Sequence, residues 1–528
     1  MRRWIALLLA LALPAAGAGP VSSRELLDAH ADADAWLLYG RNYAGWRHVE
    51  LDQINAANVA RLSPAWIFQT GVGGKHETTP LVRDGVMYAT GPSNWAWALD
   101  LASGRPLWRY SKQAPPGVNV CCGQVNRGFA MLGDRLYKVN LEATLVALDS
   151  KTGQLIWETT IDDVKRGYSA TVAPLAVKNL ILVGIAGAEF GVRGFIDAYD
   201  AMTGKRAWRF WTVPSPDEPG GHTWGGDSWK RGGGSTWITG TYDPELNLVY
   251  WGTGNPGPDF DGDVRPGDNL YTCSLVALDA DTGKLKWHFQ YTPHDVHDWD
   301  STSDPVLLDI DHDGRKVKAV IMANRNGYYY ALERATGKFL LARSYTQVSW
   351  AGGIASDGKP ILAPGQEPTE QGNKSCPGIG GGHNWQATAY NPRAGLYYFT
   401  STDGCQTYYK THQDYVDGLW YQASTTAPIP EEPASGSVLA LEPGTGKTRW
   451  RFEMASAPTS GLLSTAGGLV FGGDREGYVF ALEALSGKVL WKFQAGGTVI
   501  APPVSYLFRG KQYLAVAAGS AILTFAIP

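Results

Sequence analysis

The segment from Thr292 to Asp300 holds three carboxyl groups and two imidazoles within nine residues. Asp298 and Asp300 are separated by a single residue, and Asp295 precedes them. Carboxylates are hard oxygen ligands for hard cations, and a carboxylate within reach of a substrate proton can act as a general base. A solvated loop with Asp turns is the alternative interpretation of this string.

A pair of adjacent cysteines, Cys121 and Cys122, is the second unusual group. A disulfide between neighbouring residues closes too short a loop to restrict the unfolded chain, so stability gives little reason for it. Such a bond forms a flat, rigid surface that suits a planar ligand, whereas two free buried thiols are the alternative. Arg127 follows closely, and a guanidinium can pair bidentately with a carboxylate of a ligand.

The N-terminus predicts export. Met1, Arg2 and Arg3 precede an apolar run and the small residues Ala16 to Ala18, a pattern typical of a cleaved signal peptide over residues 1–18. An uncleaved amphipathic or anchoring helix is the alternative. The run is too short to span a bilayer, and no transmembrane segment is expected elsewhere. We therefore expect a periplasmic protein in a compartment where disulfides persist, with residues 19–528 as one mature domain.

Composition excludes several other classes. Charged residues make up 18% of the 528-residue chain and hydrophobic residues 44%, which argues against disorder and coiled coil. A net charge of −4 leaves no basic surface for nucleic acid, so no nucleic-acid partner is expected.

An internal repeat must position the chemical groups. The string Ala98 to Trp108 recurs at residues 147–157, 198–208, 277–287, 440–450 and 481–491, and a copy at 331–341 lacks the Trp. Each copy predicts a strand, a tight turn with Gly and a second strand, and units of about 40 to 50 residues are typical of propeller blades. Counting a degenerate unit near Ala389 to Tyr397, we predict an all-β, eight-bladed β-propeller whose repeated Trp residues fill the space between blades.

The repeat, the string Val118 to Arg127 and the acidic segment together resemble the quinoprotein alcohol and methanol dehydrogenases, which use pyrroloquinoline quinone (PQQ). The match extends over nearly the full chain, so residues 19–528 are expected to form a quinoprotein dehydrogenase propeller. The repeat alone also resembles an outer-membrane assembly lipoprotein without a cofactor, so function must come from the site.

The resemblance assigns roles to individual residues. The disulfide of Cys121 and Cys122 would lie on one face of PQQ and Trp237 on the other. The full implied cofactor-binding set is Glu77, Cys121, Cys122, Arg127, Thr171, Gly187, Ala188, Trp237, Arg325, Asn384 and Trp385. Asp298 would be the general base, and Arg325 would reach the reactive quinone carbonyls as the second catalytic residue. The implied metal ligands are Glu189, Asn255, Asp298 and Asp300.

The resemblance also bears on the metal. Family members with an Asp at the position of Asp300 use a lanthanide instead of calcium. Three carboxylates and the neutral Asn255 carbonyl match a trivalent ion, so we expect one lanthanide(III) ion, with Ca²⁺ as the competing assignment.

The implied reaction is oxidation of a primary alcohol to an aldehyde by hydride transfer to PQQ. There is no Cys-x-x-Cys-His motif for a covalently attached haem, so electrons are expected to pass to a separate c-type cytochrome. A calcium-dependent dehydrogenase of longer or polyhydroxylated alcohols and a non-catalytic propeller scaffold are the alternatives. The sequence leaves the oligomeric state open, a homodimer included.

Some positions depart from the family pattern. Thr459 stands where methanol dehydrogenases carry an aromatic residue near PQQ, His297 replaces a Trp, and Ala186 replaces a Ser. Methanol should therefore not be assumed as the substrate. The family also implies a disulfide between Cys376 and Cys405, which leaves Cys273 as an unpaired thiol.

Overall fold

The computed structural model describes residues 19–528, and the expected signal peptide at 1–18 lies outside them. The described chain is almost entirely β-structure. Its one α-helix is α1 (Ser23–Leu27), and no described helix is long and apolar enough to cross a membrane. The short 3-10 helices are η1 (Ala29–Ala31), η2 (Val59–Arg61), η3 (Val164–Arg166), η4 (Ala188–Phe190), η5 (Gly221–Thr223), η6 (Ser228–Arg231) and η7 (Gly262–Val264).

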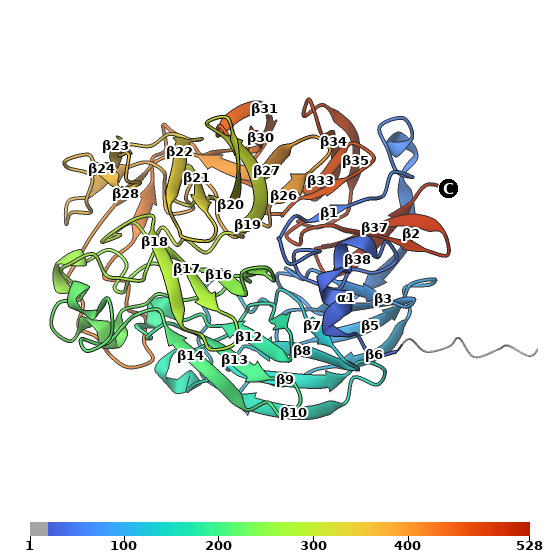
Figure 1. Ribbon diagram of the computed structural model, residues 1–528, viewed down its shortest axis with the longest axis horizontal. Helices are drawn as coiled ribbons and strands as arrows, with labels where there is room; N and C mark the ends of the chain where they lie inside the picture. The colour runs from blue at the N-terminus through green and yellow to red at the C-terminus, as the bar shows by residue number, and fades with distance from the viewer. Residues whose placement is uncertain (1–18) are drawn as a thin grey trace, which may run out of the picture.

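Eight sheets of four or five strands follow one another around a centre (Figure 1). Seven are built mainly of strands that are consecutive along the chain, each antiparallel to the next. The first sheet contains β3 (Leu81–Arg83), β4 (Val86–Thr90), β5 (Ala96–Asp100) and β6 (Pro106–Tyr110), and the second contains β7 (Ala130–Leu132), β8 (Arg135–Asn140), β9 (Thr144–Asp149) and β10 (Leu155–Thr160). The third sheet contains β11 (Leu175–Val177), β12 (Leu180–Gly184), β13 (Phe195–Asp200) and β14 (Arg206–Trp211). The fourth contains β15 (Thr241–Asp243), β16 (Leu248–Gly252), β17 (Ser274–Asp279) and β18 (Leu285–Gln290).

The next three sheets contain β19 (Val306–His312), β20 (Arg315–Ala323), β21 (Tyr328–Glu333) and β22 (Phe339–Ser344); β26 (Ala389–Asn391), β27 (Leu396–Asp403), β30 (Ser435–Glu442) and β31 (Lys447–Met454); β32 (Leu463–Thr465), β33 (Leu469–Gly473), β34 (Tyr478–Glu483) and β35 (Val489–Gln494), with β1 (His48–Val49) added parallel to β32. The predicted propeller is confirmed. The predicted number of eight blades stays a prediction. The sheets described here are consistent with it.

The eighth sheet closes the ring by joining the two ends of the described chain. It contains β36 (Val504–Phe508), β37 (Lys511–Ala518), β38 (Ala521–Ala526) and, from the N-terminal part, β2 (Ser63–Gln69). β2 pairs antiparallel with β38, from Ser63 opposite Ala526 to Gln69 opposite Ala521. Figure 1 shows the blue β2 beside the red β37 and β38.

One part of the repeat count was wrong. The degenerate unit at Ala389 to Tyr397 forms β26 and the start of β27, which belong to the same sheet as the repeat at 440–450. An insertion between β27 and β30 separates the two halves of this sheet and lengthens the spacing. The sheet that the repeat pattern did not predict contains β36, β37, β38 and β2, whose strands come from distant parts of the described chain.

The repeated Trp residues pack between neighbouring sheets, as predicted. The indole of Trp287 covers the turn of the next sheet, and a Cβ added to Gly337 there would lie 2.5 Å from the indole. Its Nε1 donates to the Arg334 carbonyl oxygen at 3.2 Å. Equivalent bonds to the adjacent sheet or its flanking segment are donated by Trp66, Trp108, Trp208, Trp450 and Trp491. Trp66, in β2, supplies the corresponding indole for the sheet that β2 forms with β36, β37 and β38.

The segment before β2 fixes the centre of the ring. Arg47 is fully buried, and its guanidinium donates to the carbonyl oxygens of Tyr39, Leu462 and Pro503 at 2.6, 3.2 and 3.1 Å. The two latter residues precede β32 and β36, so one side chain ties the N-terminal segment to two sheets. Arg47 thus satisfies carbonyl groups that would otherwise be buried without donors.

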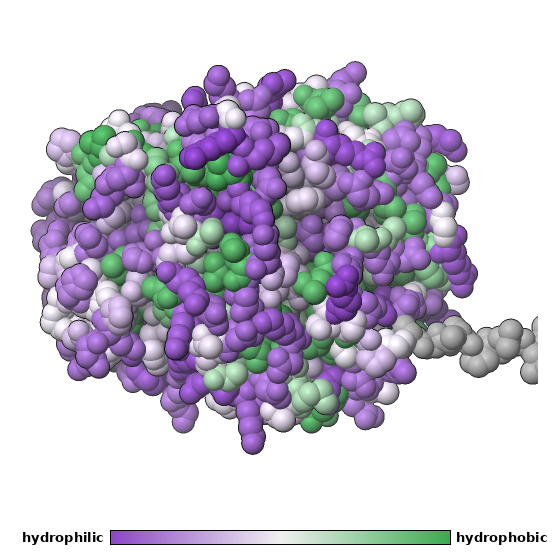
Figure 2. Space-filling model, in the orientation of Figure 1, coloured by the Kyte–Doolittle hydropathy of each residue, from purple (hydrophilic) through white to green (hydrophobic). Residues whose placement is uncertain are grey.

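Two small sheets lie outside the ring, formed by β23 (Ala351–Ile354) with β24 (Pro360–Leu362) and by β25 (Asn373–Ser375), β28 (Gln406–Tyr408) and β29 (Thr426–Pro428). The predicted disulfide between Cys376 and Cys405 joins the ends of β25 and β28. Cys273 is a buried free thiol, also as predicted. The face in Figure 2 is mostly hydrophilic, with small scattered hydrophobic groups.

We expect Trp287→Ala to lower the free energy of unfolding by about 3–5 kcal/mol, because it removes both a buried indole and its bond to the next sheet. Trp157→Ala is the matched control, since Trp157 is less buried and its Nε1 has no hydrogen-bond partner. Denaturant unfolding followed by tryptophan fluorescence measures both losses. An equal loss in the two variants would contradict this account of how the sheets are held together.

Candidate active site

A cavity of about 890 Å³ lies among the loops at one end of the ring. Its lining comes from the connections between consecutive sheets and between the second and third strands of a sheet. In a meander of antiparallel strands these two kinds of connection emerge at the same end. The topology therefore brings together side chains that are far apart in sequence, and it is the reason the predicted residues can meet.

Most of the predicted site residues line this cavity. They are Glu77, Cys121, Cys122, Arg127, Thr171, Gly187, Glu189, Trp237, Asp298, Asp300, Arg325, Asn384 and Trp385. Ala188 and Asn255 do not line it, and both are buried directly behind it. The positions that depart from the family pattern, Ala186 and Thr459, line it as well, whereas His297 does not.

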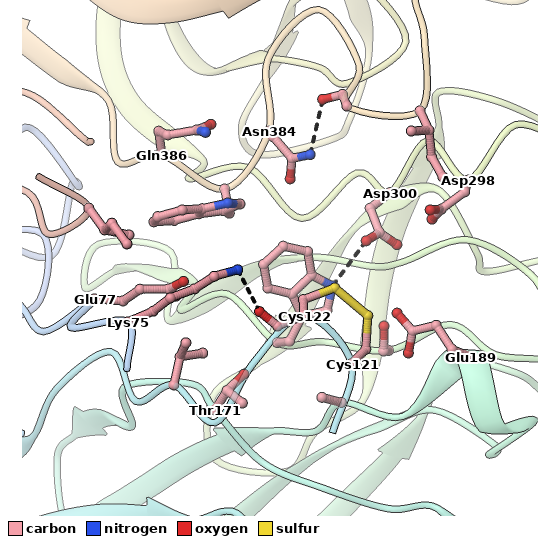
Figure 3. A pocket seen from close by; sticks show the side chains of 18 of the residues that line it. Lys75, Glu77, Cys121, Cys122, Thr171, Glu189, Asp298, Asp300, Asn384 and Gln386 are labelled. Atoms are coloured by element: carbon pink, nitrogen blue, oxygen red, sulfur yellow. Dashed lines mark hydrogen bonds between the residues drawn. A yellow bond between two sulfur atoms is a disulfide. The ribbon is translucent and has the colours of Figure 1, made fainter. Parts of the chain in front are cut away.

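Cys121 and Cys122 form the predicted disulfide. Cys122 has a φ of 69°, in the left-handed region that non-glycine residues rarely adopt. The sulfur atoms lie within 4.8 Å of a carboxylate oxygen of Glu189. Because the sulfurs are bonded to each other, they offer no thiolate to a metal, and the pair instead forms a wall next to this carboxyl group (Figure 3).

Arg127 is held between two acceptors and two indoles. Its guanidinium contacts the Glu77 carboxylate at 2.7 Å and donates to the Thr171 hydroxyl at 2.8 Å. It lies 4.9 Å from the ring centre of Trp237 and 5.6 Å from that of Trp385. Its buried Nε has no hydrogen-bond partner, so the site retains one donor for a ligand.

A cluster of carboxyl groups occupies the other end of the cavity, where Figure 3 places Glu189, Asp298 and Asp300. Arg325 bridges two of them, with 3.2 Å to Asp298 Oδ2 and 3.0 Å to Asp300 Oδ2. Asp300 also accepts bonds from the Trp237 indole at 3.0 Å and from the Asn255 backbone N–H at 2.7 Å. The Trp237 bond links the indole wall to the acidic end.

A fourth carboxyl group near this cluster, that of Asp259, was not predicted from the sequence. It is fully buried, its Oδ1 accepts a bond from Asn255 Nδ2 at 2.8 Å, and its Oδ2 has no partner. Asp259 lies four residues after Asn255, so its proximity to a predicted ligand was the available signal. Asp259 does not itself line the cavity. The polar or aromatic lining residues that were not predicted include Lys75, Gln386, Trp420, Gln422 and Arg475.

The electrostatics of the acidic end favour a cation. Burial, reinforced by Asp300, raises the pKa of Glu189 to about 7. Burial also raises the pKa values of Asp259, Asp298 and Asp300 above their usual range, against the opposing charge of Arg325 on the latter two. The three carboxyl groups that line this end of the cavity share one guanidinium, that of Arg325, and the buried Asp259 nearby keeps an unpartnered carboxylate oxygen. These residues therefore fit a hard, multiply charged ion.

Local backbone geometry aims the carboxyl groups. Asp298 has a φ of 62°, and the Asp295 carboxylate accepts the Trp299 N–H at 3.0 Å across this turn. His297 stacks on Trp299 with ring centres 4.2 Å apart, so it supports the turn instead of lining the cavity. Gly187, with a φ of 117°, begins the short helix η4 that carries Glu189, and a Cβ there would lie 2.3 Å from the Gly167 carbonyl oxygen.

Comparison with known proteins agrees with this geometry. Residues 36–352 match the model of the glucose/ethanol/alcohol dehydrogenase β-propeller domain, and residues 434–527 match that of the outer membrane protein assembly factor BamB. The chain is 39% identical to quinohemoprotein alcohol dehydrogenase ADH IIB of Pseudomonas putida, over 97% of this chain and 77% of that protein. Identity to quinoprotein alcohol dehydrogenase PedH of Pseudomonas putida is 36%, over 97% and 90% of the two chains.

Relatives with lanthanides in their names are also close. The lanthanide-dependent methanol dehydrogenase of Methylacidiphilum fumariolicum is 35% identical over 94% of this chain and 86% of that protein. The solved structure of a europium-containing methanol dehydrogenase superposes with a TM-score of 0.91, at 32% identity, over 95% of this chain and the whole of that chain. The chain belongs to the PQQ-dependent alcohol dehydrogenase family, and is thus an enzyme and not a propeller scaffold.

Proposed function

We propose that this chain is a periplasmic dehydrogenase that oxidises a primary alcohol to an aldehyde with PQQ and one lanthanide(III) ion or Ca²⁺. The observation that carries the proposal is the cluster of Glu189, Asp298 and Asp300 at one end of a cavity whose walls are a disulfide and two indoles. Asp259 is buried nearby, where it accepts a bond from Asn255. A planar polycarboxylate suits such walls, and a hard cation suits such a cluster.

The residues available to hold PQQ are of three kinds. The Cys121–Cys122 disulfide and Trp237 offer flat surfaces, Arg127 offers an unpartnered N–H donor, and Thr171 and Asn384 offer polar contacts. When bound, PQQ supplies the hydride acceptor and the cation supplies a Lewis acid. Glu189, Asp298 and Asp300 would provide charged oxygen ligands. Asn255 donates its amide N–H to Asp259, which leaves its amide oxygen as a fourth candidate ligand.

Asp298 is the proposed general base. Its side chain is 15% exposed and lines the cavity, so an alcohol hydroxyl can reach it. The base must be ionised to accept the alcohol proton. Burial raises the pKa of Asp298, and Arg325 at 3.2 Å opposes that shift, as a bound cation would. Arg325 also places a fixed positive charge at this end of the cavity, where negative charge develops during hydride transfer.

Three carboxylate ligands favour the trivalent ion, because each added negative charge stabilises a trivalent cation more than a divalent one. The relatives that are named lanthanide-dependent support this preference. The competing proposal is a calcium-dependent enzyme for longer or polyhydroxylated alcohols. It gains support from Thr459, whose small side chain lines the cavity at the position where methanol dehydrogenases carry an aromatic residue.

A separate c-type cytochrome is the proposed electron acceptor, since the sequence has no motif for a covalently attached haem. The relatives named quinohemoproteins support acceptance of electrons by a haem. The periplasmic location rests on the basic and apolar pattern of residues 1–18 and on the Cys121–Cys122 and Cys376–Cys405 disulfides, which persist in oxidising compartments.

We expect Asp298→Asn to retain bound PQQ, seen as near-ultraviolet absorbance of the protein, while the turnover number falls by about 10²- to 10⁴-fold. The amide keeps the shape of the carboxyl group but cannot accept the alcohol proton. Asp357→Asn is the control, because it replaces an exposed carboxyl group that does not line the cavity. Full turnover in Asp298→Asn would refute the assignment of the base.

We expect Asp300→Asn to weaken Tb³⁺ binding by at least about tenfold and to weaken Ca²⁺ binding less, since it removes one charge and keeps the size of the side chain. Trp237 donates to Asp300, so Tb³⁺ luminescence sensitised by tryptophan reports binding at this end. Asp357→Asn, which removes an exposed carboxyl group outside the cavity, is the control.

Activity of the PQQ-loaded wild type with La³⁺ and with Ca²⁺ completes this test. Greater activity with La³⁺ is the expected result. Equal or greater activity with Ca²⁺, together with an equal loss of affinity for both ions in Asp300→Asn, would favour the calcium-dependent alternative.

A further inference from the structure

Two basic side chains lie at the rim of the cavity. Lys75, in the connection between β2 and β3, and Arg475, between β33 and β34, are exposed to solvent and also line the cavity. A residue with both properties lies where the cavity opens. Their connections come from neighbouring sheets of the ring, so both approach the opening from the same arc of the propeller.

These two cations are not neutralised by the protein. Within residues 19–528, neither forms an ion pair. The one side-chain hydrogen bond of Lys75 goes from Nζ to the Cys122 carbonyl oxygen at 2.8 Å (Figure 3). A hydrogen bond to a neutral carbonyl leaves the ammonium charge uncompensated. The Arg475 carbonyl accepts a bond from the Thr498 hydroxyl, which holds the backbone of this loop and leaves the guanidinium free.

Among the acidic groups of the lining, Glu77 lies near Lys75, but it has a closer partner. Glu77 is buried and pairs with Arg127 at 2.7 Å. Glu189, Asp298 and Asp300 lie on the opposite side of the view in Figure 3 from Lys75 and Glu77. The cavity is therefore polarised, with basic groups at the rim and at Arg127 and acidic groups at the far end.

We propose that Lys75 and Arg475 attract the polycarboxylate PQQ to the cavity and that Lys75 then contacts a cofactor carboxylate beside the Cys121–Cys122 wall. The inference rests on the proposed function, since it assigns two further residues to the binding of the same cofactor. Unpaired charges at the mouth of a low-dielectric cleft raise the association rate of an oppositely charged ligand. The polarity of the cavity also orients the ligand, because its carboxylates are repelled from the acidic end until a cation is present.

The test measures PQQ association with the metal-free, PQQ-free full chain by stopped-flow quenching of tryptophan fluorescence. At about 20 mM salt, we expect Lys75→Met and Arg475→Met each to lower the association rate by about threefold to tenfold, and the double variant more. Above about 0.5 M salt the rates should converge with that of the wild type, because screening shortens the reach of exposed charges. Lys151→Met, which removes an exposed charge on the turn after β9, should behave as the wild type.

Two further variants separate charge from a purely structural role of the Lys75–Cys122 bond. Lys75→Arg keeps the charge and should retain the wild-type rate, whereas Lys75→Glu should be slower than Lys75→Met at low salt. Wild-type rates in the Lys75 and Arg475 variants at low salt, or a slowing that persists unchanged at high salt, would overturn the inference. Failure of the wild type itself to quench with PQQ would instead overturn the proposed function, and this inference with it.

Discussion

The structure depends on a charge imbalance that it keeps out of water. Glu189, Asp298 and Asp300 share one end of a cavity with the guanidinium of Arg325, and Asp259 is buried nearby. Burying one charge without a partner is costly, and several like charges together are more so. The cluster persists because rigid connections hold it, among them the Asp295–Trp299 turn, the short helix η4 and the Asn255 bonds to Asp259 and Asp300. A bound cation would neutralise the excess negative charge of these carboxyl groups.

Much of this architecture could be predicted from the sequence because the signals were local. The repeats end in a turn with Gly and a Trp, and each falls on the last two strands of a sheet. Cys121 and Cys122 are adjacent in sequence, so the sequence left open only whether they form a disulfide or two free thiols. The carboxyl groups of the Asp298 loop are likewise neighbours in sequence. For such groups the spacing along the chain already constrains the spacing in three dimensions.

What could not be predicted depends on contacts between distant segments. The sheet of β36, β37, β38 and β2 has no continuous sequence, so the repeat search assigned its place to Ala389 to Tyr397. Asp259 belongs to the acidic end only because the Asn255 side chain turns toward it. Lys75 lies two residues before the predicted Glu77, but its place at the rim follows only from the fold.

The pairing of β2 with β38 has a consequence for how the enzyme matures. Residues that wall the cavity come from loops all around the ring, and the ring is complete only when the last described strand meets an early one. The loops that wall the cavity are therefore held in a closed ring only once β38 has paired with β2. Assembly of the cavity thus depends on contact between strands from opposite parts of the described chain.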